Sequence, residues 1–154
     1  AAELGPRLGP ILLQLPPKLA YDAETAAAFF GHWRSCFDGP TVLEPRNPSW
    51  FEAEPDALLV AHRIARVAAD PACVSAAAVP GGWDGLRYWR LHGSPRMYSS
   101  SYDDGRLEPL AAAITSAASP AWCVFDNTMH AAAAANALDL TALAGAQRPA
   151  AASS

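Results

Sequence analysis

The sequence predicts an α/β protein built on parallel β-strands. Short apolar runs alternate with longer segments of helical periodicity, and proline or glycine separates most of them. No Asn-Gly pair, the usual signal of a hairpin, interrupts this alternation. Apolar residues make up 51% of the 154 residues and charged residues 17%, which is enough for the core of one domain. A strand followed by a helix, repeated about five times, is typical of a parallel sheet.

Five strands are expected, each an apolar run that ends at a proline, a glycine or a polar residue. The first is closed by Pro16-Pro17, which the interior of a helix does not tolerate. The third is rich in alanine, a poor strand former, and is the weakest of the five. The expected strands lie near residues 10–15, 41–45, 65–69, 86–92 and 121–126, with loops over 79–82 and 93–106.

Four helices are expected between these strands. Asp22 precedes the first helix, whose apolar residues recur at helical spacing, and is placed to cap it. Gly145 is expected to end the last helix. Residues 146–154 are rich in Ala, Ser and Pro and are expected to be disordered. The expected helices cover residues 23–37, 54–64, 107–118 and 130–144.

Charge and composition argue against several classes of partner. The net charge is -4, the pI is near 5.4 and no basic run occurs, which argues against nucleic acid or an anionic membrane as the main partner. No apolar stretch of about 18 residues is present, so no membrane span is predicted. The first ten residues lack the basic start and apolar centre of a signal peptide. Three widely spaced cysteines without a C-x-x-C pattern favour reduced thiols, and we expect a cytoplasmic protein.

Polar residues end nearly every predicted strand. In parallel α/β proteins the carboxyl ends of the strands lie on one side, and ligands bind there. We therefore expect these side chains to converge on one pocket for a small polar or anionic molecule. The alternative is that strand ends simply emerge into water. The residues concerned are Gln14, Glu44, Arg46, Asp70, Arg90, His92, Asp126 and Asn127.

Two pairs of residues sharpen this expectation. Glu44 and Arg46 are two apart and share a strand face, so they could aim a guanidinium at a carboxylate or phosphate, or form a structural bridge. Arg90 and His92 also share a face, and the neighbouring positive charge favours a neutral imidazole that could act as a base. Arg96 follows in a loop of small residues that could hold an anion or be an ordinary loop. The patterns of dinucleotide-binding loops, P-loops, serine-hydrolase elbows and zincin metalloproteases are absent.

At these residues the sequence resembles the YecE-like bacterial proteins, a family of unknown function with a TIM-barrel-like fold. The resemblance runs along nearly the whole chain in the expected order and adds Trp50 and Tyr98 to the candidate ligand-binding residues. Two departures are Asn47, where members often carry His, and Ala131-Ala132, where many have a glycine. The matching pieces are residues 8–17, 43–50, 66–71, 88–95, Tyr98, Tyr102, 125–128 and 136–138.

The resemblance implies an incomplete TIM (β/α)8 barrel in residues 1–145, corresponding to strands four to eight. Family members begin with further βα units, including a first strand resembling Gly-Thr-Ser-Gly-Trp. Five strands cannot close a barrel that needs about 200–250 residues. We therefore expect either a missing N-terminal segment or a homo-oligomer that covers the open face. An open doubly wound sheet is the alternative architecture.

Three functional hypotheses follow. The first is an enzyme-like domain in which Glu44, Asp70 and His92 do acid/base work, with the reaction and cofactor unknown. The second is a non-catalytic remnant or binding module that lacks a complete site. The third is metal-dependent chemistry with the same three residues as ligands. The candidate ligand-binding residues of the first hypothesis are Gln14, Arg46, Trp50, Arg90, Arg96, Tyr98, Asp126 and Asn127.

Overall fold

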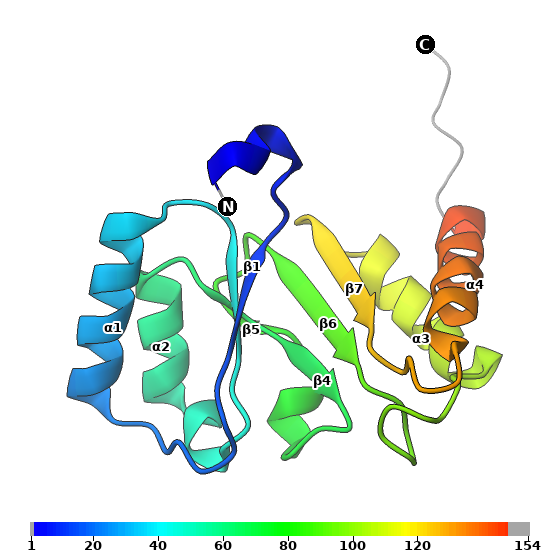
Figure 1. Ribbon diagram of the computed structural model, residues 1–154, viewed down its shortest axis with the longest axis horizontal. Coiled ribbons are helices and arrows are strands. Elements are labelled where there is room, and N and C mark those ends of the chain that lie inside the picture. The colour runs from blue at the N-terminus through cyan, green and yellow to red at the C-terminus, as the bar shows by residue number, and fades with distance from the viewer. Residues whose placement is uncertain (1, 148–154) are drawn as a thin grey trace.

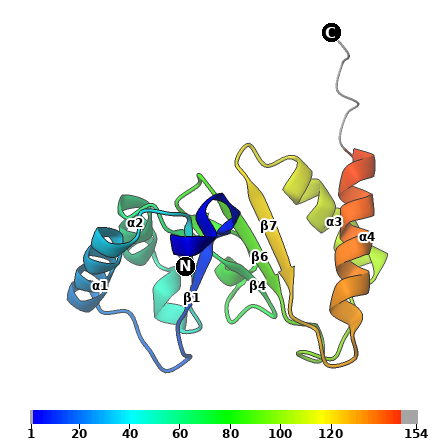
Figure 2. The same ribbon diagram turned by 45° about the horizontal axis from the view of Figure 1, so that its top comes forward.

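The computed structural model describes residues 2–147 as a curved layer of strands flanked by four α-helices (Figure 1). Helices α1 (Ala23–Cys36) and α2 (Ala53–Ala61) lie on one side of the molecule. Helices α3 (Asp104–Thr115) and α4 (Ala132–Gln147) lie on the other side, and Figure 2 shows the strands between the two pairs. The predicted α/β class is therefore confirmed. Within the described residues, no helix is long and apolar enough to cross a membrane.

The five predicted parallel strands are present in chain order, the third of them divided into β3 and β4, and they are distributed over two sheets. One sheet has the order β1-β2-β3-β5 and the other β4-β6-β7, and within residues 2–147 only the β3–β5 pair is antiparallel. The order does not reverse along the chain as it would in a doubly wound sheet. Neither sheet closes on itself within residues 2–147. The strands are β1 (Ile11–Gln14), β2 (Thr41–Glu44), β3 (Ala65–Arg66), β4 (Ala68–Asp70), β5 (Gly81–Gly82), β6 (Arg87–Leu91) and β7 (Ala121–Phe125).

The third predicted strand is divided at Val67 between the two sheets. β3 pairs with β2, whereas β4 pairs with β6. The backbone N–H of Val67 donates to the carbonyl of Leu43 at 2.9 Å, so the connection to the first sheet continues through the break. One predicted strand therefore joins the two sheets.

Residues 79–82, predicted as a loop, include a short strand. β5 runs antiparallel to β3, with Ala65 opposite Gly82 and Arg66 opposite Gly81. Gly82 has a φ of 64°, and a Cβ atom there would lie 2.7 Å from the carbonyl oxygen of Ile64. Only glycine fits this position, because both the backbone angle and the close approach exclude a side chain. The glycines at 81 and 82 predicted a loop, and this prediction missed the pairing of β5 with β3.

The 3₁₀ helices and the end of α4 differ from the predictions. The connection from β4 to β6, for which no helix was predicted, contains the 3₁₀ helix η3 (Ser75–Ala78). α4 continues through Gly145 to Gln147, so this glycine does not end the helix, and residues 146 and 147 are helical. Residues 148–154 of the predicted tail lie outside the described residues. Two more 3₁₀ helices, η1 (Ala2–Arg7) and η2 (Pro48–Phe51), precede β1 and α2.

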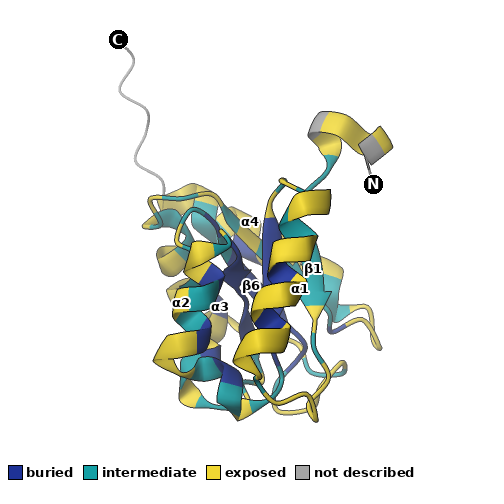
Figure 3. Cartoon of the chain, turned by 90° about the vertical axis from the view of Figure 1, so that its left-hand side faces the viewer, coloured by how far each residue is buried: buried dark blue, intermediate teal, exposed yellow. Residues whose placement is uncertain are grey.

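The two faces of the strands pack differently. On one face, Leu43 packs with residues of α1 and α2, and Leu91 packs with residues of α3 and α4. On the other face, Val42 and Tyr88 form a separate apolar cluster with neighbouring strands. Figure 3 shows buried residues concentrated in the strands, while much of α1 is exposed. The side chains two residues further along the second face belong to the candidate site.

We expected the face that would line a closed barrel to be open, and only part of this second face is exposed. Val42 is fully buried and Tyr88 is 7% exposed, because Leu86, Trp83 and neighbouring strand residues cover them. Trp122 of β7, in contrast, is 45% exposed. The exposed apolar surface on this face is therefore small and lies at the edge strand.

Candidate functional site

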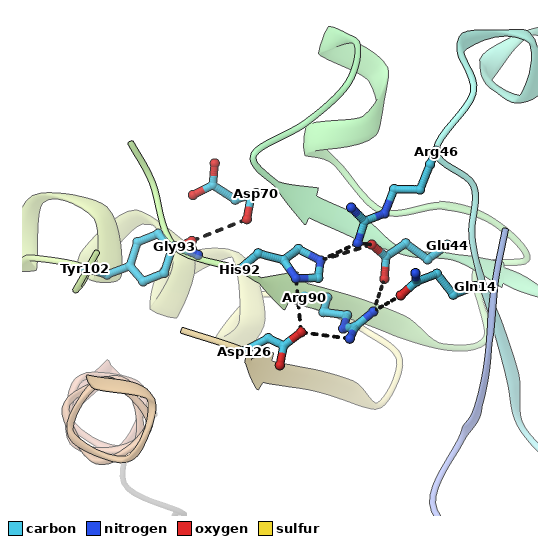
Figure 4. Close-up of polar contacts among 9 residues, drawn as sticks. All are labelled: Gln14, Glu44, Arg46, Asp70, Arg90, His92, Gly93, Tyr102 and Asp126. Carbon is cyan, nitrogen blue, oxygen red and sulfur yellow. Dashed lines mark hydrogen bonds and ion pairs between the residues drawn. The ribbon is translucent and has the colours of Figure 1, made fainter. Parts of the chain in front are cut away.

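Alternation along the strands places the polar residues of several strands on one face. Side chains two residues apart on a strand share a face, so Glu44 follows Val42, and Arg90 follows Tyr88. Gln14 ends β1 opposite Glu44, with which it pairs in the register of the sheet. The face that carries Val42 and Tyr88, called the inner face below, therefore changes from an apolar layer to a charged layer toward the carboxyl ends of the strands. Figure 4 shows the residues of the charged layer.

Glu44 lies at the centre of this charged layer, and its side chain has no solvent exposure. Its Oε1 atom lies 2.5 Å from Nη2 of Arg46 and 3.0 Å from Nε2 of His92. Its Oε2 atom accepts a hydrogen bond from Nη1 of Arg90 at 2.8 Å. A fully buried carboxylate needs such partners, because removing an unpaired charge from water is costly.

Electrostatics keep Glu44 ionised. Burial alone would raise the pKa of this carboxyl, but hydrogen bonds from His92 and Arg90, with the charges of Arg46 and Arg90, lower it to about 2. Burial opposes the charged form of Arg90 as well, yet the contact with Glu44 and the charge of Asp126 raise its pKa above the ordinary value. Glu44 is therefore a fixed negative charge that orients three neighbouring groups.

Arg90 and Asp126 extend the network toward the solvent. Arg90 also donates to Oε1 of Gln14 at 2.5 Å and to Oδ2 of Asp126 at 2.8 Å. The side chain of Asp126 is 32% exposed and that of Arg90 is 17% exposed. We call the six residues in contact the Glu44 network. Its members are Gln14, Glu44, Arg46, Arg90, His92 and Asp126.

His92 lies between two carboxylates and a guanidinium. Its Nδ1 atom is 3.2 Å from Oδ2 of Asp126, and its Nε2 atom is 2.9 Å from Nη2 of Arg46. With a proton on Nδ1 alone, the ring donates to Asp126 and accepts from Arg46. The ring is therefore held in one orientation by three charged neighbours, Glu44, Arg46 and Asp126.

Arg46 has incomplete hydrogen bonding. Its side chain is 19% exposed, and its Nε atom is buried without a hydrogen-bond partner among the described residues. Buried N–H groups are nearly always satisfied, by protein, water or a ligand. Arg46 is therefore the member of the network that retains a free donor.

The loop that follows β6 packs beside His92 and begins with a residue that must be glycine. Gly93 has a φ of 96°, and a Cβ atom there would lie 3.0 Å from the carbonyl oxygen of Arg96. The Gly93 N–H donates to the hydroxyl of Tyr102 at 2.8 Å. Burial raises the pKa of this hydroxyl, so Tyr102 stays neutral. The ring of Tyr98 meets the His92 ring edge-on at 5.9 Å.

The structure places Asp70 away from the network. Asp70 pairs with Leu91 in the register of the sheet, and Leu91 packs against α3 and α4. The side chain of Asp70 therefore lies on the face toward α3 and not on the inner face. Its Oδ2 atom pairs with Arg106 at 2.8 Å, and Figure 4 shows its carboxylate pointing away from Glu44. A cavity of about 290 Å³ lies there, lined by residues that include Asp70, Trp89, Tyr102 and Arg106.

Three other candidate residues also lie outside the network. Trp50 is buried in the core beside α1, and its indole N–H donates to the carbonyl of Leu19. Arg96 is exposed, and its backbone N–H donates to Ser100. Asn127 is buried and donates to the side chain of Asn136 at 2.9 Å and to the carbonyl of Ser100. These contacts anchor the core and the loop after β6.

Asn136 is a structural residue that the sequence reasoning did not identify. Its Oδ1 atom accepts from the backbone N–H of Tyr102 at 3.1 Å, and its Nδ2 atom donates to the carbonyl of Tyr102 at 2.8 Å. An isolated asparagine in the alanine-rich stretch before 147 was the available signal, because asparagine is a poor helix former. Asn136 fixes the loop that carries Tyr98.

The described residues contain no group of three or more His, Cys, Asp or Glu side chains placed to hold a metal ion. The proposed ligand set of Glu44, Asp70 and His92 is not assembled, since Asp70 lies on the opposite face. Glu44 and His92 instead satisfy each other at 3.0 Å. Both cysteines at positions 36 and 73 are exposed and unpaired, and burial raises the pKa of Cys123 to about 12.

Comparison with protein-family models gives a match over residues 1–154 to the family described as proteins of unknown function, DUF72. The chain belongs to the DUF72 family. A search of curated proteins gives no significant match to this DUF72 chain.

Solved DUF72 structures share the fold. A DUF72 protein from Thermotoga maritima superposes with a TM-score of 0.72 at 20% identity, covering 89% of this chain and 58% of that one. Two structures of a DUF72 protein from Enterococcus faecalis give TM-scores of 0.73 and 0.70 at 19% and 22% identity. They are covered over 60% and 61% of their length, and cover 91% and 88% of this chain. The chain thus spans less than two thirds of each neighbour, and the likeness concerns the fold alone.

Proposed function

We propose that the Glu44 network binds a small molecule through an anionic group, a phosphate or a carboxylate. The observation that carries this proposal is the meeting of Arg46 and Arg90 on one buried carboxylate, with the Nε donor of Arg46 left without a partner. Two guanidinium groups at the carboxyl ends of parallel strands suit an oxyanion, because their planar donors match its geometry. The two guanidinium groups and two carboxylates of the network balance in charge, so a bound anion would be held by directed hydrogen bonds from the guanidinium groups and not by net positive charge.

Within this proposal, the residues of the network have different roles. Glu44 acts as a positioning residue, since a carboxyl with a pKa of about 2 is too weak a base for proton transfer near neutral pH. His92, held by Asp126 at 3.2 Å, is the candidate for proton transfer. Gln14 and Asp126 are exposed enough to contact the polar groups of a ligand. Asp70 has no role at this site.

The same proposal includes the architecture. The five parallel strands in chain order, and the neighbours of which this chain covers 58% to 61%, support a chain that corresponds to the later strands of a YecE-like TIM-barrel-like domain. In such a barrel the charged layer would lie inside the carboxyl end, which is where barrel enzymes bind their substrates.

A second candidate role is a self-contained ion-pair network in a non-catalytic domain. It is favoured by the contacts of Glu44 and Arg90, whose side-chain partners are all members of the network. Networks of this kind fix the relative positions of strands without binding anything. The two roles differ in what removal of Arg46 does to anion binding.

Isothermal titration with inorganic phosphate and with acetate tests the proposal. We expect Arg46→Met to weaken binding of the preferred anion at least tenfold, because one charge-assisted hydrogen bond is lost. Arg63→Met is the matched control, since Arg63 pairs with exposed Asp38 near the amino ends of the strands, and it should leave the affinity unchanged. If neither anion binds, or if both variants weaken binding equally, the self-contained network is the better explanation.

A further inference from the structure

Tyr98 has a backbone conformation that tyrosine rarely adopts. Its φ is 64°, in the left-handed region that favours glycine, and only Arg63 and Ala131 share this feature among the described non-glycine residues. Strained residues of this kind persist only where the surrounding structure holds them, and they concentrate at functional sites.

The surroundings of Tyr98 hold it from both sides. Its N–H donates to the carbonyl of His92, and its own carbonyl accepts from the N–H of Met129 at 3.0 Å. The loop is further fixed by Asn127, which donates to the carbonyl of Ser100 at 3.0 Å. The left-handed angle is therefore imposed by hydrogen bonds to two different strand ends.

This conformation places an aromatic ring beside the charged network. The Tyr98 and His92 rings meet at 87°, and Tyr98 remains 41% exposed. Met97 and Met129 are 40% and 64% exposed, and the hydroxyl of Ser99 lies 3.1 Å from the sulfur of Met129. An exposed aromatic and polarisable surface therefore adjoins the network at His92.

We propose that Tyr98 determines ligand specificity by packing against a planar or apolar part of the bound molecule. This inference rests on the proposed function and narrows the substrate class to anions that carry a ring next to the charged group. The charged network holds the anion, and the tyrosine ring provides the apolar wall that small-molecule sites usually have. Tyr98 touches the ligand and does not act through His92.

Two esters of equal charge test the inference. Phenyl phosphate and methyl phosphate differ in the ring, so the ratio of their dissociation constants in isothermal titration reports ring contacts. We expect the chain to bind phenyl phosphate about fivefold more tightly, as one aromatic contact provides. Tyr98→Gly should reduce this ratio to about one while keeping the affinity for methyl phosphate within about twofold.

The choice of glycine separates loss of contact from loss of folding. Glycine adopts a φ of 64° without strain, so Tyr98→Gly should melt at the same temperature as the unmodified chain or higher. Ala131→Gly relieves a similar angle of 60° and removes no ring, so it should leave the ratio of the two esters unchanged. Tyr98→Phe should retain the preference for phenyl phosphate.

The outcomes distinguish this inference from the proposal on which it rests. If neither inorganic phosphate nor acetate nor either ester binds the unmodified chain, both the anion site and the role of Tyr98 are overturned. If phosphate or acetate binds but neither ester does, the role of Tyr98 is overturned and the anion site stands. If both esters bind with equal affinity, or if Tyr98→Gly keeps the preference, the role of Tyr98 is overturned and the anion site stands.

Discussion

The two ends of the strands use arginine in different ways. Near the amino ends, Arg34 donates to four backbone carbonyls, those of Phe37, Gly39, His62 and Arg63, at 2.7 to 3.2 Å. At the carboxyl ends, Arg46 and Arg90 instead bind side-chain carboxylates. Backbone carbonyls do not titrate and do not exchange hydrogen-bond partners easily. Carboxylates can do both, and the free Nε donor of Arg46 can accept a new partner. The difference separates an arginine that holds the fold from arginines that are available to a ligand.

The surroundings of the two ends support the same distinction. Arg34 lies beside an apolar cavity of about 280 Å³ whose lining includes Leu8, Trp83 and Trp122. Burial and the nearby charge of Arg63 lower the pKa of Arg34, although it remains a cation. No carboxylate comparable to Glu44 is buried among the described residues at that end.

Glu44→Gln should have the largest effect on stability. The carboxyl has a pKa of about 2 in the fold against an ordinary value of 4.5, so its contribution is present above pH 4.5 and lost as the pH falls toward 2. At pH 7 we expect the free energy of unfolding to fall by about 3 kcal/mol. Urea unfolding at pH 7 and pH 3 should show the difference from the unmodified chain shrinking at the lower pH. Exposed Glu108→Gln is the control, and an equal loss for it would contradict the prediction.

Arg34→Met should have an intermediate effect, confined to stability. Four carbonyls lose a charged donor, but water reaches part of this region, so we expect a loss of about 2 kcal/mol in urea unfolding. The affinity for phosphate or acetate, measured by titration, should stay unchanged because Arg34 lies near the opposite ends of the strands. A weakened affinity in a folded variant would show that the two ends do not act separately.

Asp70→Asn should have the smallest effect. Its partner Arg106 is 61% exposed, and exposed ion pairs contribute about 0.5 kcal/mol. Anion affinity should not change, since this carboxylate lies on the face toward α3. A loss of affinity as large as that of Arg46→Met would move the binding site to that face.

The sequence was sufficient to predict where the parallel strands lie and their order, but not the short strand β5 or the division of the third strand. Apolar runs closed by proline, such as the run before Pro16, mark strand ends, and helical spacing marks the segments between them. The pairing of Glu44 with Arg46, left open against other roles, is present at 2.5 Å. Residues two apart in extended backbone share a face whatever the tertiary structure. The contact between Glu44 and Arg46 could therefore be predicted from their spacing alone.

The face occupied by Asp70 could not be predicted from the sequence. Residues 65–69 are mostly alanine and carry no alternation that distinguishes one strand face from the other. The division of the strand at Val67 depends on the partners of β3 and β4, which lie far apart in the chain. Trp50 was equally ambiguous, since an aromatic residue after a strand suits a core or a ligand site.

Gly145 shows a related limit at the end of α4. Glycine is a common helix terminator, but here a Cβ atom would meet nothing within 4 Å, and the helix continues to Gln147. The hydroxyl of Thr115 in α3 donates to Oε1 of Gln147 at 3.3 Å, so contact between the two helices extends beyond Gly145.

The division at Val67 places the Glu44 network across two hydrogen-bonded sheets. Gln14, Glu44 and Arg46 belong to the first sheet or follow it, whereas Arg90, His92 and Asp126 belong to or follow the second. Local unfolding usually proceeds in such contiguous units, each with its own free energy of opening. A ligand held by both Arg46 and Arg90 would cross-link them. Ligand binding would then couple the unfolding of the two sheets. Slower amide exchange on both sides of Val67 would accompany binding.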